Sequence, residues 1–191
     1  MELTSSCRSK DVRDVTPFEI KESLESMTLI IDTREQATER ARKRIELTGL
    51  PAERRKLNVG DYSCFCLLPD GTEFSMERRI TIERKMDIDE LCMCFGKERK
   101  RFEREFDRAK ESGTKVYLIV ENGTWEHVYN GKYRSKLTPQ ALVASIDAFR
   151  ARYGMQLDFC KADTTGKLIR DILYRELKET LERREENGLE I

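Results

Sequence analysis

Acidic and basic side chains follow apolar runs at three separate places in the chain. In "TIERKMDID" (81–89), Glu83 and Lys85 stand two positions apart on an expected strand, so their side chains point to the same face. Asp61 in "VGDY" and Asp32 in "IDTRE" each follow an apolar run as well. Because a buried run fixes the position of the charge that follows it, we expect three carboxylates and one lysine to converge on a cleft.

Such a cluster suits the hydrolysis of phosphodiester bonds. Mg²⁺ takes hard oxygen ligands and binds one or two carboxylates together with waters and a substrate phosphate. The ion would polarise the scissile bond and activate a water, and a lysine would stabilise the additional negative charge of the transition state. The alternative is a solvated strand end, at which Glu83, Arg84 and Lys85 simply pair with Asp87 and Glu90. We favour the metal site because the charges follow buried runs in three segments.

Four motifs resemble the XPF/Hef nuclease domain family in their order and approximate spacing. They are "IDTRE" (31–35), "LNVGDY" (57–62), "IERKMDID" (82–89), which carries the Glu-Arg-Lys-x-x-x-Asp signature, and "VYLIVENG" (116–123). The resemblance covers about residues 28 to 180. It implies a restriction-endonuclease-like three-layer α/β/α core with a central mixed sheet. It also implies a metal-dependent DNA endonuclease, with flap, fork or branched DNA as candidate substrates.

The resemblance also assigns roles to individual residues. It implies that Asp61 and Glu83 bind Mg²⁺, for which Mn²⁺ can substitute, that Asp32 is a further acid beside the metal, and that Lys85 assists hydrolysis. Four more positions match the motifs and are expected to orient neighbours or contact a backbone phosphate: Arg34, Glu35, Arg84 and Asp89.

A basic stripe beside the expected cleft is a candidate DNA-binding surface. Helical projection from residue 97 gathers Lys97, Arg101, Arg104 and Arg108 on one side, away from the apolar positions. The alternative is a solvated face neutralised by nearby glutamates: Glu98, Glu105 and Glu111. A second basic region spans residues 39–56, and phosphate contacts from either region would make DNA affinity fall steeply with salt.

Strand and helix patterns alternate along the chain and predict an α/β sandwich. We expect a helix at Pro17 capped by Thr16, strands at 28–32, 116–120 and 155–160, a hairpin that turns at 69–71, helices that end before Gly113 and Gly154, and a last helix capped by Thr164 or Thr165. The domain boundaries follow: an arm and short helix over 1–27, the nuclease domain over 28–182, and a flexible tail over 183–191.

Composition excludes several classes of protein. The 36 Lys and Arg balance 36 Asp and Glu, so there is no overall basic field, and no apolar run approaches the ~20 residues of a membrane span. The start of the chain has no secretory signal, so we expect an intracellular protein with reduced cysteines. No glycine-rich loop ends in Lys-Ser or Lys-Thr, so no nucleotide cofactor is expected.

Two other possible sites are weaker. Cys64, Cys66, Cys92 and Cys94 could make a zinc site, but one intervening residue in each pair is fewer than zinc ligands usually have, and buried cysteine is common in cores. His127, the single histidine, stands next to a turn and is more typical of a surface residue than of a general base.

Partners follow from the resemblance and leave two functions open. Family domains pair through their C-terminal region, so we expect a homodimer through the C-terminal helices, with DNA as the substrate. The chain ends where eukaryotic and archaeal members continue into a helix-hairpin-helix domain, so it resembles the stand-alone versions of bacteria and phages. The alternative to an enzyme is a noncatalytic DNA-binding or assembly module of the same fold. Asp61, Glu83 and Lys85 favour the enzyme, because such modules lack the acids.

Overall fold

The computed structural model describes residues 16–187. The helices are α1 (Pro17–Glu25), α2 (Glu39–Thr48), α3 (Ile88–Phe95), α4 (Arg99–Glu111), α5 (Trp125–Tyr129), α6 (Pro139–Tyr153) and α7 (Thr165–Asn187). The strands are β1 (Thr28–Asp32), β2 (Ala52–Arg55), β3 (Tyr62–Leu67), β4 (Glu73–Ser75), β5 (Ile80–Lys85), β6 (Lys115–Glu121) and β7 (Gln156–Cys160). Within residues 16–187, no helix is both long enough and apolar enough to cross a membrane.

The strands form one mixed sheet in the order β2-β1-β3-β5-β6-β7, with β4 paired to β3. β5, β6 and β7 run parallel, as do β1 and β2, whereas β3 is antiparallel to β1, β4 and β5. Consequently β3 begins at the end of the sheet where β1, β5 and β6 finish. At that end β3 touches β5 through a single register pair, Tyr62 with Ile82, because β4 lies beside β3 farther along.

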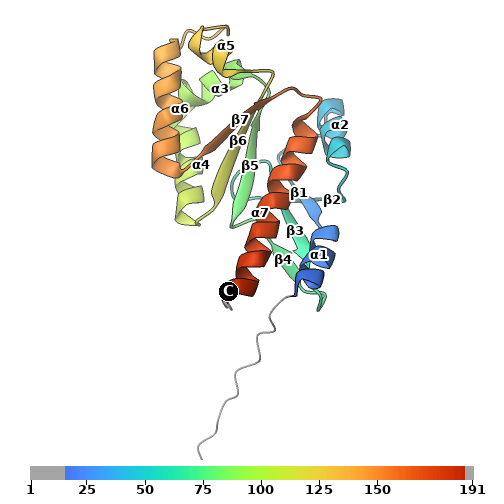
Figure 1. The fold of residues 1–191 in the computed structure, drawn as a ribbon. Coiled ribbons are helices and arrows are strands. Elements are labelled where there is room, and N and C mark those ends of the chain that lie inside the picture. Colours follow the sequence, from blue (N-terminus) through green and yellow to red (C-terminus); the bar gives the residue numbers. More distant parts are fainter. Residues whose placement is uncertain (1–15, 188–191) are drawn as a thin grey trace, which may run out of the picture.

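Helices cover both faces of the sheet, which gives the predicted three-layer α/β/α architecture (Figure 1). On one face α1 and α7 bury Ile20, Leu24 and a line of leucines and isoleucines of α7 against β1, β3 and β5. On the other face α3, α4 and α6 enclose a second apolar core with four phenylalanines in mutual ring contact: Phe95, Phe102, Phe106 and Phe149.

Local signals in the sequence explain most element boundaries. Thr16 accepts a hydrogen bond from the backbone of Glu19 in a capping box, and Thr138 caps α6 in front of Pro139. Gly154 ends α6 in the left-handed conformation, with φ 64°. These helix ends agree with the predictions.

Other boundaries differ from the predictions or lie beyond the description. The sequence patterns missed β2, a short charged edge strand, since its four residues carry little apolar character. α7 continues to Asn187, past the predicted domain end at 182, and residues 188–191 of the predicted tail lie outside the described part. The predicted loose arm over residues 1–15 lies outside it as well.

Candidate active site

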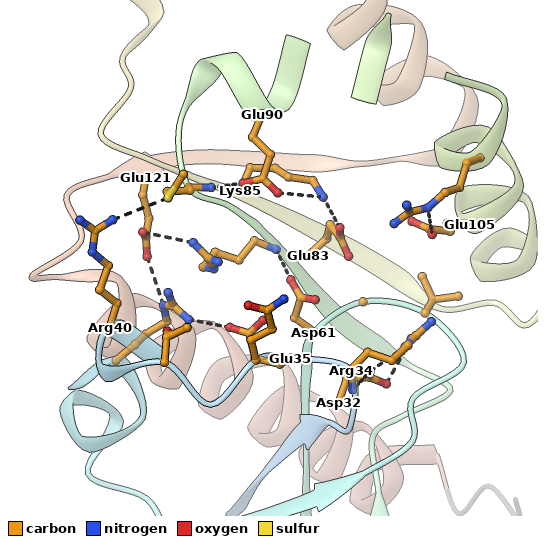
Figure 2. Close-up of a pocket in the computed structure, with 18 of the residues that line it drawn as sticks. Asp32, Arg34, Glu35, Arg40, Asp61, Glu83, Lys85, Glu90, Glu105 and Glu121 are labelled. Carbon is orange, nitrogen blue, oxygen red and sulfur yellow. Dashed lines mark hydrogen bonds and ion pairs between the residues drawn. The ribbon is translucent and has the colours of Figure 1, made fainter. Parts of the chain in front are cut away.

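A cleft of about 800 Å³ opens at the end of the sheet where β1, β5 and β6 finish and β3 begins. Figure 2 shows that acidic and basic side chains from these strands point into it. Asp32 ends β1, Asp61 immediately precedes β3, and Glu83 and Lys85 lie on the last residues of β5. The alternation of parallel and antiparallel strands thus brings together three segments that are distant in the sequence.

Asp61 is held in place by a tight backbone turn. Its N–H donates to the carbonyl of Ile82 at 2.8 Å, and its carbonyl accepts the N–H of Asp32 at 2.8 Å. Gly60, with φ 77°, makes the turn possible, because a Cβ at this position would lie 2.1 Å from Oγ1 of Thr81. One carboxylate oxygen of Asp61 accepts the backbone N–H of Arg84 at 2.8 Å. The backbone therefore connects Asp61 directly to β5.

Glu83 and Lys85 form an ion pair on the same face of β5. Lys85 Nζ donates to Glu83 Oε1 at 2.6 Å and lies 3.9 Å from Glu90 Oε1. Both side chains of the pair are buried, and Nζ lies 5.4 Å from the ring centroid of Phe102. The ammonium group is therefore fixed beside the carboxylate. The alternative, a solvated strand end paired with Asp87 and Glu90, does not describe this end of β5: Glu83 and Lys85 are buried and Asp87 caps α3, although Glu90 does lie near Lys85.

Burial and mutual charge perturb the ionisation of these groups. Part of the surface of Asp61 is exposed to the cleft, but protein atoms enclose the rest, and this desolvation together with the charge of Glu83 raises the pKa of Asp61 well above its ordinary value. Burial also raises the pKa of Glu83, although the charge of Lys85 opposes the shift. Burial disfavours the charged form of Lys85, but the carboxylate of Glu83 outweighs it and raises the pKa of Lys85. The lysine is thus cationic at neutral pH.

Asp32 has a different environment from the other two acids. Its Oδ1 accepts the backbone N–H and the Nε–H of Arg34, both at 2.7 Å, and its Oδ2 accepts the N–H of Leu57 at 2.7 Å. Burial raises the pKa of Asp32, but the hydrogen bonds from Arg34 and Leu57 outweigh it, so the pKa lies below its ordinary value. The carboxylate is 1% exposed. Asp32, predicted as a metal ligand, acts in this structure as an anchor for Arg34 and the Leu57 backbone.

A buried arginine that sequence reasoning missed lies in the wall of the cleft. Arg44 of α2 donates to Glu35 Oε1 at 2.9 Å, to the hydroxyl of Tyr62 at 2.7 Å and to Glu121 Oε1 at 3.2 Å. The second oxygen of Glu121 accepts from Arg84 at 3.3 Å. This network joins α2 to the loop after β1 and to β3, β5 and β6 at the end of the sheet that bears the cleft.

Other predicted site residues are divided between the cleft and its surroundings. Arg34, Glu35, Arg84, Arg101 and Arg108 line the cleft. Asp89, Lys97 and Arg104 do not: Asp89 accepts hydrogen bonds from the backbone of Arg134 and Ser135, and Lys97 precedes α4. The alternative to a DNA-binding stripe, a solvated face neutralised by glutamates, holds for Arg101, which pairs with Glu98 and Glu105.

The acids of the cleft fit a cation bound by two carboxylates. Within residues 16–187, no three His, Cys, Asp or Glu side chains are grouped so that they could hold a metal ion. Mg²⁺ needs only one or two carboxylates, since waters and substrate phosphates complete its shell. Asp61 and Glu83 are such a pair: burial raises the pKa of both, and the charge of Glu83 raises that of Asp61 further.

The two weaker sites receive no support from the geometry. Cys64 and Cys66 lie in the core between the sheet and α7, whereas Cys92 and Cys94 lie in the core on the opposite face, so the four thiols cannot share one ion. His127 lies in the short helix α5 rather than in a turn.

Sequence signals for the missed residues differ. Glu121 follows the apolar run of β6, so the rule that identified Asp32 could also have found it. Arg44 stands among many charged residues of α2, and nothing in the pattern marks it as buried.

The comparisons with known proteins agree with this geometry. The family model described as ERCC4 domain matches residues 31–172. Among solved structures, XPF from Aeropyrum pernix shares 21% identity at a TM-score of 0.57, covering 83% of this chain and 69% of that one. XPF from Aeropyrum pernix in complex with DNA shares 22% identity at a TM-score of 0.55, covering 80% of this chain and 66% of that one. Comparison with curated proteins finds no match. Since the family match spans more than half of the sequence, the chain belongs to the ERCC4 domain family as an XPF-type nuclease domain.

Proposed function

We propose that the protein is a metal-dependent endonuclease that hydrolyses DNA phosphodiester bonds. The observation that carries the proposal is the convergence of Asp61, Glu83 and Lys85 in one cleft of an XPF-type domain. One of the similar solved structures is a complex with DNA, which supports DNA as the substrate class. In this proposal Asp61 and Glu83 hold Mg²⁺ or Mn²⁺, and Asp32 is not one of the ligands.

The side chains of the cleft divide the chemistry among them. A divalent cation bound by the two acids would polarise the phosphodiester and supply an activated water. The ammonium group of Lys85 stabilises the additional negative charge on the phosphorane-like transition state, and Glu83 keeps that group in position through the 2.6 Å contact. Because Lys85 is buried, its side chain is already ordered and loses little conformational freedom when substrate binds. Lys85 thus acts as a fixed positive charge at the scissile phosphate.

Cations on the walls of the cleft support a path for the DNA backbone. Arg101 and Arg108 of α4 line one wall, and Arg40 of α2 lines the other. Arg101 already has acidic partners, so its contribution to affinity depends on exchanging them for phosphate. Each phosphate contact adds to the salt dependence of binding. We further propose a preference for flap, fork or branched DNA, and a homodimer formed through the C-terminal helices.

Cleavage of defined substrates tests the proposal. Supercoiled plasmid and labelled linear, fork, flap and junction DNA are incubated with Mg²⁺, Mn²⁺ or EDTA, and products are quantified for the wild type and Glu83→Gln. We expect metal-dependent cleavage by the wild type and a loss of at least about 100-fold in Glu83→Gln, since a charged ligand and the partner of Lys85 are both lost. Glu73→Gln is the matched control, because Glu73 of the hairpin strand β4 pairs with Arg55 of β2 and does not line the cleft. Unchanged cleavage by Glu83→Gln would refute the proposal.

A noncatalytic DNA-binding module is the second candidate. It would bind the same DNA substrates with similar affinity in EDTA and in Mg²⁺ and would cleave none of them. The positions of Asp61 and Glu83 argue against it, because a module without catalysis gains nothing from a buried acid, Glu83, beside a second acid whose pKa its charge raises.

A further inference from the structure

A single carboxylate, that of Glu121, lies between two arginines at the end of β6. Its Oε1 accepts from Arg44 Nε at 3.2 Å and its Oε2 accepts from Arg84 at 3.3 Å. Glu121 lines the cleft but is only 4% exposed, and the residues of β6 that precede it are largely buried, so its carboxylate is held by its surroundings. In Figure 2 the dashed lines from the carboxylate of Glu121 mark these two hydrogen bonds.

The two arginines differ in how many partners they have. Arg44 is 5% exposed and uses its guanidinium on Glu35, Tyr62 and Glu121. The Tyr62 hydroxyl donates in turn to Glu35 at 2.9 Å, which closes the network. Arg44 is therefore fixed from several sides and can serve as an anchor.

Arg84 has only one side-chain partner among the described contacts. Its side chain lines the cleft and is 16% exposed, and Glu121 is the group that accepts from it. Its Nε is buried and has no acceptor in the described part of the chain. A guanidinium carries five N–H donors, so most of the donors of Arg84 remain available for an oxygen-rich ligand.

The rear of the network is equally restricted. A Cβ at Gly166 of α7 would lie 2.2 Å from the carbonyl oxygen of Arg44, so α2 and α7 approach each other as closely as their backbones allow. α2 thus cannot shift toward α7 to relax its contact with Glu121. α7 therefore restrains α2, Arg44 of α2 restrains Glu121, and Glu121 restrains Arg84 at the wall of the cleft.

We propose that Glu121 and Arg44 are positioning residues, which hold the Arg84 guanidinium at the wall of the cleft so that it contacts a phosphate of the DNA. The backbone N–H of Arg84 also donates to the carboxylate of Asp61 at 2.8 Å. The same residue thus connects the proposed phosphate contact to the two proposed metal ligands, Asp61 and Glu83. The inference rests on the proposed function, because it takes DNA as the ligand. It goes beyond that function in assigning roles to two residues that touch neither the proposed metal nor the scissile phosphate.

A double-mutant cycle tests the inference. Glu121→Gln, Arg84→Met and the double variant are compared in affinity for a fork DNA oligonucleotide with Ca²⁺, in the cleavage rate with Mg²⁺, and in thermal stability. Since a charge-assisted hydrogen bond is lost, we expect Arg84→Met to weaken affinity by about 10- to 100-fold. We expect a smaller loss of about 3- to 10-fold for Glu121→Gln, because the amide keeps one acceptor but not the charge. The double variant should bind no more weakly than Arg84→Met alone.

The matched control is Glu176→Gln. Glu176 likewise bridges two polar partners, Lys115 and Tyr117, but it lies far from the cleft on α7. It should leave DNA affinity and cleavage unchanged. Additive losses in the cycle, or a Glu121→Gln variant that loses thermal stability but binds and cleaves DNA as the wild type does, would overturn the inference.

A readout without DNA separates this inference from the proposed function. The buried Nε–H of Arg84 should give an ordered resonance in ¹⁵N NMR spectra of the wild type, assigned by its absence in Arg84→Met. We expect Glu121→Gln to shift or broaden it and Glu176→Gln to leave it unchanged. If the resonance does not change in Glu121→Gln, the positioning role is refuted whatever the activity. If it changes but the wild type neither binds nor cleaves DNA, the positioning geometry is supported and the proposed function fails.

Discussion

Replacing Gly60 by alanine should both destabilise the fold and displace Asp61. The backbone at Gly60 has φ 77°, a conformation that costs a residue with a Cβ about 1–2 kcal/mol. The new Cβ would also lie 2.1 Å from Thr81 Oγ1 and 3.0 Å from the carbonyl oxygen of Ile82. Neither neighbour moves freely, because Thr81 is buried and its hydroxyl donates to the carbonyl of Val59 at 2.8 Å.

The expected magnitude is the sum of these two effects. Overpacking of this kind typically costs about 1–3 kcal/mol, so the total loss of stability is about 2–5 kcal/mol. For a domain of this size each kcal/mol lowers Tm by about 2–4 °C, which gives a fall of about 4–20 °C. If the clash is relieved by moving Asp61 by as much as ~1 Å, cleavage should fall by up to about 100-fold, since misplacement on that scale has such an effect.

Gly71→Ala is the matched control for Gly60→Ala. Gly71 has nearly the same φ of 80°, but no atom lies within 4 Å of the position of its Cβ, and it belongs to the hairpin turn away from the cleft. It should lower Tm by about 2–8 °C through backbone strain alone and leave the specific cleavage activity of the folded protein unchanged. Thermal denaturation and single-turnover cleavage are measured for both variants and for Gly60→Ala with Thr81→Ala, in which we expect part of the clash to be relieved. Equal losses of Tm and equal activity in Gly60→Ala and Gly71→Ala would refute the reasoning.

Three further predictions concern the same end of the sheet. In metal-free buffer Asp61→Asn should raise Tm, because the pKa of Asp61 is raised in the folded state and its ionisation therefore weakens the fold as pH rises through that pKa. The gain in Tm should grow from about pH 4 upward. A gain that is independent of pH would contradict this assignment. Mg²⁺ should raise Tm of the wild type but not of Asp61→Asn. Lys85→Met should reduce cleavage by about 100- to 1,000-fold, because the transition state loses a positive charge. It should retain Mn²⁺ binding, measured by calorimetry, because Glu83 loses its cationic partner and stays available to the metal. Loss of Mn²⁺ binding would show that the lysine supports the site rather than the transition state. Gly166→Ala should lower stability by about 1–3 kcal/mol in urea denaturation, because its Cβ meets the backbone of Arg44, and an unchanged midpoint would disprove the close approach of α2 and α7.

Residues at the ends of apolar runs could be placed from the sequence because strand geometry leaves few choices. Once "TIERK" is a strand, Glu83 and Lys85 must share a face, and their contact at 2.6 Å follows from that alternation. The hairpin and the tight turn before Asp61 also have local signals in glycine and proline positions. Local rules therefore predicted the α/β class, most boundaries and the segments that form the cleft, whereas the three-layer core came from the family resemblance.

Pairing between distant segments could not be predicted in the same way. Which acid pairs with which base depends on how α2 and the loop after β1 lie over the sheet, and the sequence holds several equivalent charges in each segment. Asp32 was expected beside the metal and is paired with Arg34 in the wall of the cleft, and Asp89, expected to orient neighbours or to contact a phosphate, holds the loop before α6. Arg44 was not selected at all, although it is among the most buried charged residues of the described chain.

The distribution of ion pairs itself indicates where a cation belongs. Arginines neutralise Asp32, Glu35, Glu121 and Glu105 within 3.4 Å. Asp61 forms no ion pair within 4.0 Å among the described residues, and Glu83 shares the single charge of Lys85 with Glu90. Among the acids that the ends of β1, β5 and β6 and the start of β3 bring to the cleft, Asp61 and Glu83 are thus the least compensated, and they lie next to the buried Lys85. A divalent ion at that point would neutralise the pair and oppose the rise in both pKa values, whereas at Asp32 it would have to displace Arg34 and the Leu57 N–H.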